Sequence, residues 1–479
     1  MTTTIPQTIA DAAGLHEEDR GTVLRLVNTW RGHYAGNVLR NKYYQSHSML
    51  KDLGISVPDS LKNLEVACGW GYKTVEVMRD HLQFDGFDMG DMGDSAELRA
   101  LVRRNCMDVR VGKAVNSALK YCFAMWVVSA TDDDHARISV YPPTLATGIY
   151  NDITEQLDAG MFVVEFEWKN NRKTDKPSWI DVMLPDYMIQ LRKVGESWQA
   201  KYTEHGLGVV PMFIMPYNPD DDRPFGNSRI TPEVQWLIDC AIRLNVNEEI
   251  ASAFAASTQK YLLGTDGESL EGVSRWDAFI GSILEVEMNS DGGTPQFGQL
   301  TQPSMQPLSD HFNNLCKRMS AATGIHVGQF GLQSDNPSSA EAIYAENEPL
   351  ILKCRSFIRE AKCALRRVGI AALATEAGMS YTEAEDLYDV NARFLNPSMP
   401  TLAQMADSSI KLAGVVEGFA NTPTFWRMNG LDNDESRDVR REVTDNRARD
   451  EARSAAIAVA AQVENVPALM DGESGDESN

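Results

Sequence analysis

Two helix-forming segments, Thr231–Ser257 and Leu308–Thr323, enclose a stretch of mixed character, and this arrangement constrains the fold more than any other feature. The first segment begins sharply, because Thr231 is a good N-cap and Pro232 suits the first helical position. The enclosed stretch, Gln259–Gln302, predicts a small αβ insertion. We therefore expect a helical hairpin with an insertion at its tip. A single copy would leave the apolar flanks of this hairpin exposed, whereas copies packed head to tail around a ring would bury them.

The segment after the second helix predicts an irregular loop followed by a long helix. From Gly324 to Ser338 the chain reads GIHVGQFGLQSDNPS, with three glycines and a proline. Ser338 suits the N-cap of a helix that extends to about Thr375. Pro349 lies inside that helix, where it loses one backbone hydrogen bond and clashes with the carbonyl group of Ala345. We therefore expect a kink at Pro349.

The remaining segments divide into a helical beginning, a β-rich middle and a helical end. At the beginning, helical spacing is seen in Glu17–His33, Asn63–Leu82 and Ser95–Val127. In the middle, short β-branched and aromatic runs predict antiparallel strands at Arg137–Tyr141, Phe162–Trp168, Trp179–Leu184, Tyr187–Leu191 and Val209–Met215. Turn-like segments such as Lys169–Lys176 and Lys193–Ser197 separate these runs. At the end, helices are expected at Thr401–Phe419, Thr422–Asn429 and Glu435–Val463, before an acidic tail at Asp471–Asn479. The predicted class is α+β, mainly helical.

Composition bounds the class of function. The 479 residues suffice for two to four domains, and the formal net charge is −23. Such a chain would repel nucleic acid, so tight nonspecific binding is not expected, although an acidic wall suits a channel through which DNA slides. The seven cysteines form no C-x-x-C pair, which favours free thiols and no zinc site. The segment Met1–Asp11 lacks the pattern of a signal peptide, and the sequence has no apolar run long enough for a membrane span. We therefore expect a cytoplasmic protein.

Patterns of catalytic residues are missing from the sequence. It contains no G-x-x-x-x-G-K-[ST], G-x-S-x-G or H-E-x-x-H motif, so we predict no enzymatic activity, no cofactor and no metal. An acidic repeat at Asp85, Asp88, Asp91 and Asp94 leaves a metal-dependent enzyme as the alternative. Its spacing does not fit an EF-hand, and a solvated loop is the favoured interpretation. The clusters Asp132–His135 and Asp220–Asp222 are interpreted as turns.

A basic helix face is the remaining candidate for contact with nucleic acid. It comprises Lys353, Arg355, Arg359, Lys362, Arg366 and Arg367. These residues could contact DNA phosphates. The net charge favours the other interpretation, in which they pair with acidic neighbours or lie at a subunit interface.

Six short motifs, in order, resemble the portal proteins of siphophages, in the branch found among phages of actinobacteria. The resemblance extends from about Leu26 to about Glu442. The motifs are LGISVPDSLKNLEVACGW (Leu53–Trp70), VMRDHLQFDGF (Val77–Phe87), FGNSRITPEV (Phe225–Val234), QKYLLG (Gln259–Gly264), SRWDAFIG (Ser274–Gly281) and GLQSDNPSSAEAI (Gly331–Ile343).

The resemblance implies a ring, usually of twelve subunits, with wing, stem, clip and crown regions. Mapped onto this chain, it divides the sequence into a wing (1–230), a first stem helix (231–257), a clip (258–304), a second stem helix (305–324), a tunnel loop (325–337), a long kinked helix with further wing (338–400), crown helices (401–470) and the acidic tail (471–479). Another head–tail connector is a further alternative, although such proteins usually lack the order stem, clip, stem.

The resemblance also implies sites and partners. The DNA-facing tunnel loop would comprise Val327, Gly328, Gln329, Phe330, Gly331, Leu332, Gln333, Ser334, Asp335 and Asn336. The clip would dock terminase and then a head–tail adaptor through residues such as Tyr261, Asp266, Glu268 and Trp276. Double-stranded DNA, the major capsid protein and scaffolding protein would be the other partners. The protein would be at a capsid vertex of the virion, and in the host cytoplasm during assembly.

Overall fold

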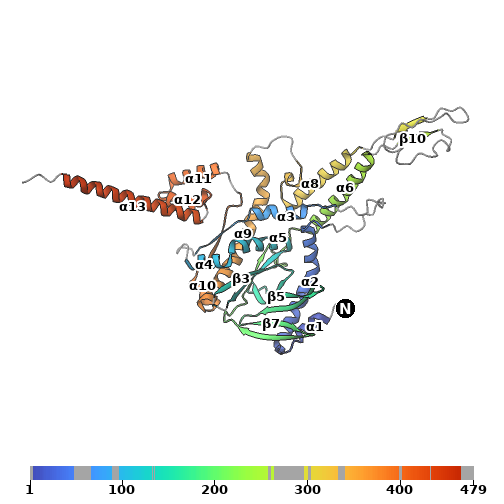
Figure 1. The fold of residues 1–479 in the computed structure, drawn as a ribbon, viewed down its shortest axis with the longest axis horizontal. Helices are drawn as coiled ribbons and strands as arrows, with labels where there is room; N and C mark the ends of the chain where they lie inside the picture. Colours follow the sequence, from blue (N-terminus) through green and yellow to red (C-terminus); the bar gives the residue numbers. More distant parts are fainter. Residues whose placement is uncertain are drawn as a thin grey trace, which may run out of the picture. The chain divides into compact units, whose positions relative to one another are not determined.

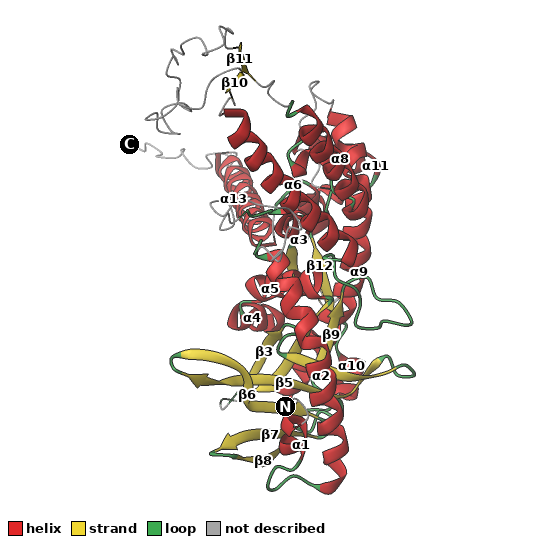
Figure 2. Ribbon diagram, turned by 90° about the vertical axis from the view of Figure 1, so that its right-hand side faces the viewer, coloured by secondary structure: helices red, strands yellow, loops and turns green. Residues whose placement is uncertain are grey.

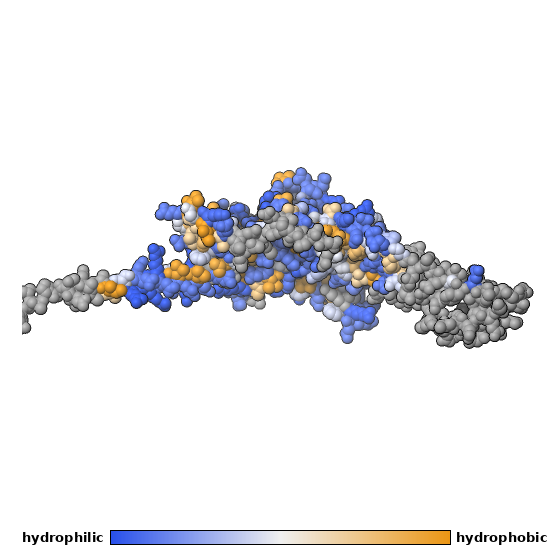
Figure 3. Space-filling view, turned by 90° about the horizontal axis from the view of Figure 1, so that it is seen from above, coloured by the Kyte–Doolittle hydropathy of each residue, from blue (hydrophilic) through white to orange (hydrophobic). Residues whose placement is uncertain are grey.

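A computed structural model gives the fold of the 479-residue chain. It describes residues 4–47, 66–88, 96–131, 133, 135–256, 260–263, 296–299, 304–332, 340–398, 402–431 and 433–464. The chain divides into two compact units, Met1–Ser398 and Met399–Asn479 (Figure 1). Hydrophobic side chains gather in separate patches on a largely hydrophilic surface (Figure 3). None of the described helices combines the length and apolar character that a membrane span requires.

A five-stranded antiparallel sheet forms one end of the first unit. Its strand order is β4 (Ala146–Asn151), β5 (Gln156–Lys169), β6 (Arg172–Met183), β7 (Tyr187–Val194) and β8 (Ser197–Glu204). Helices α1 (Thr4–Ala10) and α2 (Glu17–Tyr44) share a core with this sheet. The predicted apolar stripe of α2 is confirmed, because Val23, Leu26, Val27 and Trp30 are buried there. Buried Asp19 fixes the start of α2 by accepting hydrogen bonds from the hydroxyls of Tyr187 (3.0 Å) and Tyr202 (2.8 Å).

A second sheet, of order β3–β2–β9, joins the first sheet to the helices. It comprises β3 (Ala136–Tyr141), β2 (Phe123–Ala130) and β9 (Met212–Pro216). Alternate residues of β2 point to opposite faces. Ala124, Trp126 and Val128 lie in the helical core, while Phe123, Met125 and Val127 lie in a core shared with the first sheet. The middle strand is therefore buried on both faces.

The helical core of the first unit contains α3 (Trp70–Asp80), α4 (Ala96–Asn105), α5 (Met107–Tyr121), α6 (Pro232–Ala256), α8 (Gln306–Thr323), α9 (Ala340–Ala377) and α10 (Tyr381–Leu387). A short antiparallel ribbon, β1 (Phe84–Asp88) with β12 (Asn391–Phe394), packs against this core. A second ribbon, β10 (Lys260–Leu263) with β11 (Gln296–Gln299), lies between α6 and α8 in the sequence. The start of α3 approaches the end of α2 closely. A Cβ atom at Gly71 would lie 2.3 Å from the carbonyl oxygen of Tyr43, so only glycine fits there.

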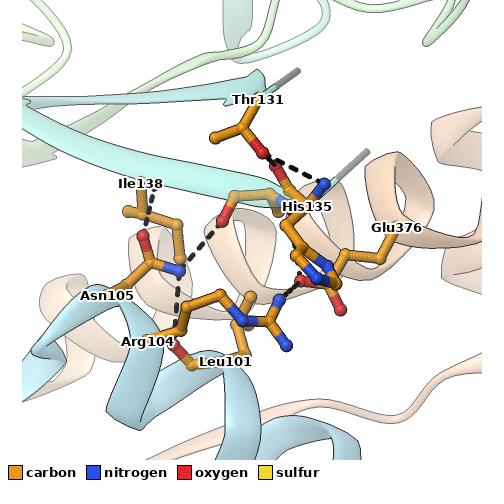
Figure 4. Close-up of polar contacts among 8 residues, drawn as sticks. Leu101, Arg104, Asn105, Thr131, His135, Ile138 and Glu376 are labelled. Atoms are coloured by element: carbon orange, nitrogen blue, oxygen red, sulfur yellow. Dashed lines mark hydrogen bonds and ion pairs between the residues drawn. The ribbon is translucent and has the colours of Figure 1, made fainter. Parts of the chain in front are cut away.

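A polar joint connects α4, the β2–β3 turn and the end of α9 (Figure 4). Buried Asn105 donates to the carbonyl of Ala136 at 3.0 Å and accepts from the backbone N–H of Ile138 at 2.9 Å. Arg104 pairs with Glu376, whose carboxylate also accepts from the N–H of Ala136. Asp132–His135, one of the acidic clusters of the sequence, falls in this turn, of which Asp133 and His135 are described.

The second unit contains α11 (Leu402–Val415), the 3₁₀ turn η5 (Phe419–Asn421), α12 (Pro423–Met428) and α13 (Asn433–Glu464). The predicted C-terminal helix at Glu435–Val463 therefore exists. The hydroxyl of buried Ser409 donates to the side-chain oxygen of Asn429 at 3.0 Å, which connects α11 to the residue after α12. The acidic tail at Asp471–Asn479 lies outside the described residues.

Three sequence expectations are corrected by the structure. The helix expected over Ser95–Val127 ends at Tyr121, because the run Phe123–Val128 alternates between two cores and is a strand. The turn expected at Lys169–Lys176 is shorter than predicted and consists of Asn170 and Asn171 only. The acidic stretch from Asp85 begins as strand β1 rather than as a loop.

Asp181 makes the stability of the first sheet depend on pH. Its side chain on β6 is buried, and this burial raises its pKa to about 6, although the indole N–H of Trp179 donates to it and Arg192 is nearby. The folded chain therefore binds this proton more tightly than the unfolded chain. Consequently, the contribution of Asp181 to stability falls as the pH rises from about 4 to about 6.

We predict that Asp181→Asn increases the free energy of unfolding at pH 8 by as much as about 3 kcal/mol, because the variant has no charge to bury. The gain should disappear near pH 4. Urea unfolding at several pH values measures it, with exposed Asp186→Asn as the control. An equal gain at all pH values would contradict the role assigned to the charge of Asp181.

Candidate functional site

The helical hairpin expected from the sequence is formed by α6 and α8, which pack against each other. The hydroxyl of Thr231 accepts from the N–H of Val234 at 3.3 Å, and Pro232 is the first helical residue, as predicted. Gly324 ends α8 with φ of 73°, also as predicted. Between the two helices, β10 pairs with β11 from Lys260↔Gln299 to Leu263↔Gln296. The intervening insertion therefore leaves and returns along two adjacent strands.

A buried guanidinium group occupies the base of this hairpin. Arg229 is only 5% exposed. It donates to the carbonyl oxygens of Thr74 in α3 (2.7 Å) and Thr323 at the end of α8 (3.0 Å). Its other partners are the hydroxyl of Tyr217 and the sulfur of Met78, both at 3.1 Å. Among the described residues, none of these partners is a carboxylate, so the charge is balanced by dipoles, including the negative end of α8.

A second cation shares the same carbonyl oxygen. The ammonium group of Lys353, on α9, donates to Thr323 at 3.0 Å. Burial lowers the pKa of Lys353, and the nearby charge of Arg229 lowers it further. Arg229, Thr323 and Lys353 form what we call the anchor cluster. It joins α3, α8 and α9 at the point where the chain leaves α8 for the predicted tunnel loop.

The described part of the tunnel loop begins at the anchor cluster. Residues Val327–Phe330 form a 3₁₀ turn, η4. The imidazole of His326 accepts from the N–H of Gly328 at 3.2 Å through Nδ1, and its Nε2 lies 3.1 Å from a carboxylate oxygen of Glu346 on α9. Gly331 follows with φ of 101°, a conformation that favours glycine. The segment is therefore fixed to α9 on one side while its backbone turns sharply.

Phe330 differs in its burial from the other described residues that are predicted to face DNA. Its side chain is 4% exposed and packs edge-on against Trp70, with ring centroids 5.8 Å apart. This corrects the expectation that the side chain of Phe330 faces DNA, because it fixes the segment to the core. Gly328, Gln329 and Gly331 are exposed, whereas Val327 and Leu332 are half-buried. Gln333, Ser334, Asp335 and Asn336 lie outside the described residues.

The other predicted positions are described in part. Tyr261 lies on β10, whereas Asp266, Glu268 and Trp276 lie outside the described residues. Pro349 lies inside α9, as expected. The predicted start of that helix at Ser338 also falls outside the described residues.

The acidic repeat does not form an open cluster of ligands where it is described. The guanidinium of Arg393, on β12, lies 3.9 Å from the carboxylate of Asp85 and 3.3 Å from that of Asp88. Asp91 and Asp94 lie outside the described residues. The two carboxylates on β1 thus share one cation from the paired strand.

One group of described residues, His16, Glu18 and Asp19, brings three possible ligand atoms within 4.8 Å of one another. Both oxygens of Asp19 already accept hydrogen bonds from tyrosines. Packing at the start of α2 therefore accounts for this group.

The basic face of α9 is largely used within the protein. Lys353 belongs to the anchor cluster, and Arg367 donates to the carbonyl oxygen of Glu155 at 3.1 Å. Arg355 lies 3.8 Å from the carboxylate of Glu348, and Arg359 donates to the hydroxyl of Ser356. These contacts agree with the interpretation in which the face pairs within the protein.

Sequence reasoning did not identify the role of Arg229. The motif FGNSRITPEV contains it, but an arginine just before a helix is ordinarily a surface residue. The one feature of the sequence that indicates burial of Arg229 is its position beside Ile230, at the start of an apolar helix. Its partners come from positions 74, 217 and 323, which no local pattern connects.

Comparison with known sequences identifies the family of the chain. The family described as "Phage portal protein, SPP1 Gp6-like" matches residues 33–428. The portal protein of Mycobacterium phage D29 is 22% identical over 443 residues, covering 87% of this chain and 86% of the relative. The portal protein of Mycobacterium phage L5 is 22% identical over 427 residues, covering 85% of each.

A solved structure, "Neck of native GTA particle computed with C12 symmetry", aligns with a TM-score of 0.37 and 13% identity, covering 76% of this chain and 89% of the other. The class that the sequence matches define is that of phage portal proteins. The chain belongs to the SPP1 Gp6-like family of that class.

We predict that Arg229→Met lowers the free energy of unfolding by about 3 kcal/mol, because it removes one hydrogen-bond donor each from the carbonyls of Thr74 and Thr323 and from the hydroxyl of Tyr217. Arg229→Lys should recover only part of the loss, since lysine lacks the planar fork that reaches both carbonyls. Urea unfolding measures the change, and limited proteolysis should show faster cleavage near residues 324–332. Exposed Arg359→Met is the control, and equal losses in both variants would contradict the anchoring role.

Proposed function

We propose that twelve copies of this chain form the ring at one capsid vertex through which double-stranded DNA is packaged and ejected. The observation that carries the proposal is the family match over residues 33–428. The order α6, β10–β11 and α8 supports it, because a helix pair closed by a paired insertion fits a stem with a clip at its end.

The proposed regions follow the expected boundaries. The stem helices (231–257 and 305–324) correspond to α6 and α8, and the clip (258–304) contains β10 and β11. The wing is 1–230 with 338–400, and the crown is 401–470. We propose that the clip binds terminase during packaging and a head–tail adaptor afterwards, and that the ring also meets the major capsid and scaffolding proteins.

The tunnel loop, 325–337, is the proposed contact with DNA. Its support is the exposure of Gly328, Gln329 and Gly331, which are polar or small and uncharged. Such groups give weak, replaceable contacts with phosphates. With a net charge of −23, the chain lacks the strong attraction that would hold DNA in place.

We propose no enzymatic activity for the chain itself, and ATP hydrolysis is assigned to the terminase. The alternative of a metal-dependent enzyme at Asp85–Asp94 has less support, because Arg393 already lies beside the carboxylates of Asp85 and Asp88. Another head–tail connector is disfavoured by the family match and by the hairpin with its insertion.

The first test is the state of the purified protein in solution. We predict rings with a central hole in negative-stain electron microscopy, and a mass of about twelve subunits in solution, where one subunit has a mass of 53.1 kDa. A compact monomer or dimer under all salt conditions would contradict the proposed function.

We predict that Gln329→Lys leaves the rings intact but slows DNA packaging with terminase, since each copy adds a cation that attracts phosphate. The defect should decrease as salt is raised, because salt screens this attraction. An in vitro packaging assay measures it. The control is Gln199→Lys, which adds the same charge at an exposed residue of β8. An equal packaging defect in that control would count against the assignment of Gln329 to the channel.

A further inference from the structure

The β5–β6 hairpin extends beyond the sheet to which it belongs. The two strands pair as far as Lys169↔Arg172, around a turn in which Asn170 and Asn171 have φ of 52° and 57°. Positive φ at both positions is typical of a tight two-residue hairpin turn. The neighbouring strands end earlier, since β4 pairs with β5 only as far as Phe162 and β7 pairs with β6 only from Trp179.

The end of this hairpin, Trp168–Lys173, is called the hairpin tip. The indole of Trp168 is 66% exposed. The sequence WKNNRK places three cations in six residues, and the side chains of Lys169 and Arg172 are exposed. The hairpin tip thus places a large exposed aromatic ring beside an arginine, and both residue types are enriched where proteins meet.

An acidic groove lies at the opposite end of β5. Its volume is about 590 Å³. Five carboxylates and one guanidinium line it, those of Asp152, Glu155, Asp220, Asp221, Glu360 and Arg367. Apolar residues also contribute to the lining, among them Leu157, Met212, Phe213, Pro219 and Pro224. The groove therefore offers mainly negative charge, with some apolar side chains beside it, and this charge is complementary to that of the hairpin tip.

One strand separates the two features. β5 begins at Gln156, which lines the groove, and ends at Lys169 in the hairpin tip. Fourteen extended residues span about 45 Å, at about 3.3 Å per residue. Figure 2 shows the hairpin of β5 and β6 extending to the left of the unit. A hairpin tip therefore cannot reach the groove of its own chain.

We propose that the hairpin tip of each subunit docks in the acidic groove of the next copy of this chain. Trp168 packs against the apolar side chains of the lining, and Lys169 and Arg172 meet the carboxylates. Contacts between two different surfaces of identical chains are heterologous, and they close into a ring when the rotation permits. This inference rests on the proposed ring and adds the side chains that join its subunits.

Cross-linking tests the contact directly, because native Cys363 lines the groove and is exposed. Arg172→Cys places a second thiol at the hairpin tip, in a background where exposed Cys106 is replaced by serine. Treatment with a short bismaleimide should give a ladder of covalent oligomers on a denaturing gel. The ladder should disappear with Cys363→Ser, and Lys201→Cys, exposed on β8, should not give one.

Charge exchange tests the energetics. The double variant Lys169→Glu/Arg172→Glu should assemble less readily, because like charges would face each other at the contact. The protein concentration at which half of the subunits are assembled should rise by about tenfold or more. Adding Asp152→Lys with Asp221→Lys should restore assembly. Exposed Lys201→Glu is the control, and circular dichroism reports whether each variant is folded.

The outcomes separate this inference from the proposed function. Rings of the unaltered protein, together with the ladder and the charge rescue, support both. If the variant Lys169→Glu/Arg172→Glu forms rings equally well and cross-linking gives no ladder of oligomers, the docking is overturned. The proposed function then still stands. The absence of any ring from the unaltered protein overturns the proposed function, and the docking with it.

Discussion

The guanidinium group of Arg229 is the interaction on which the arrangement of the helices depends. Burying a charge is costly unless its hydrogen-bonding capacity is satisfied. Here two backbone carbonyls, a hydroxyl and a sulfur satisfy it, and they belong to elements far apart in the sequence. The carbonyl of Thr323 also accepts from Lys353, so two cations hold the last turn of α8. The direction in which the chain leaves α8 is fixed by this electrostatic contact as well as by packing.

Much of the secondary structure could be predicted because it depends on local rules. Thr231 and Pro232 start α6, and Gly324 ends α8, where capping rules place them. The buried stripe of α2 follows from helical spacing. By contrast, the sequence of β2 predicts a helix, although its run of apolar residues fits either structure. Its burial on both faces is decided by two separate cores that local sequence does not reveal.

The candidate site was predictable only in outline. The glycines and polar residues after α8 indicated a loop, but the burial of Phe330 depends on Trp70, far away in the sequence. The role of Arg229 likewise depends on partners from α3 and α8. The pairing of Asp85 and Asp88 with Arg393 joins two strands separated by most of the first unit. Long-range contacts of this kind leave no periodic signal in the sequence, so a reader of the sequence alone sees only an acidic repeat.

The β10–β11 ladder has a consequence for how the protein tolerates change. Its four residue pairs bring the two ends of the insertion together immediately beyond α6 and α8. A segment closed in this way contributes little to the spacing of the helices that carry it, because the entropy of closing a loop grows slowly with its length. A change in the number of residues between the two strands would therefore cost little, and the helix pair beneath them would keep its geometry.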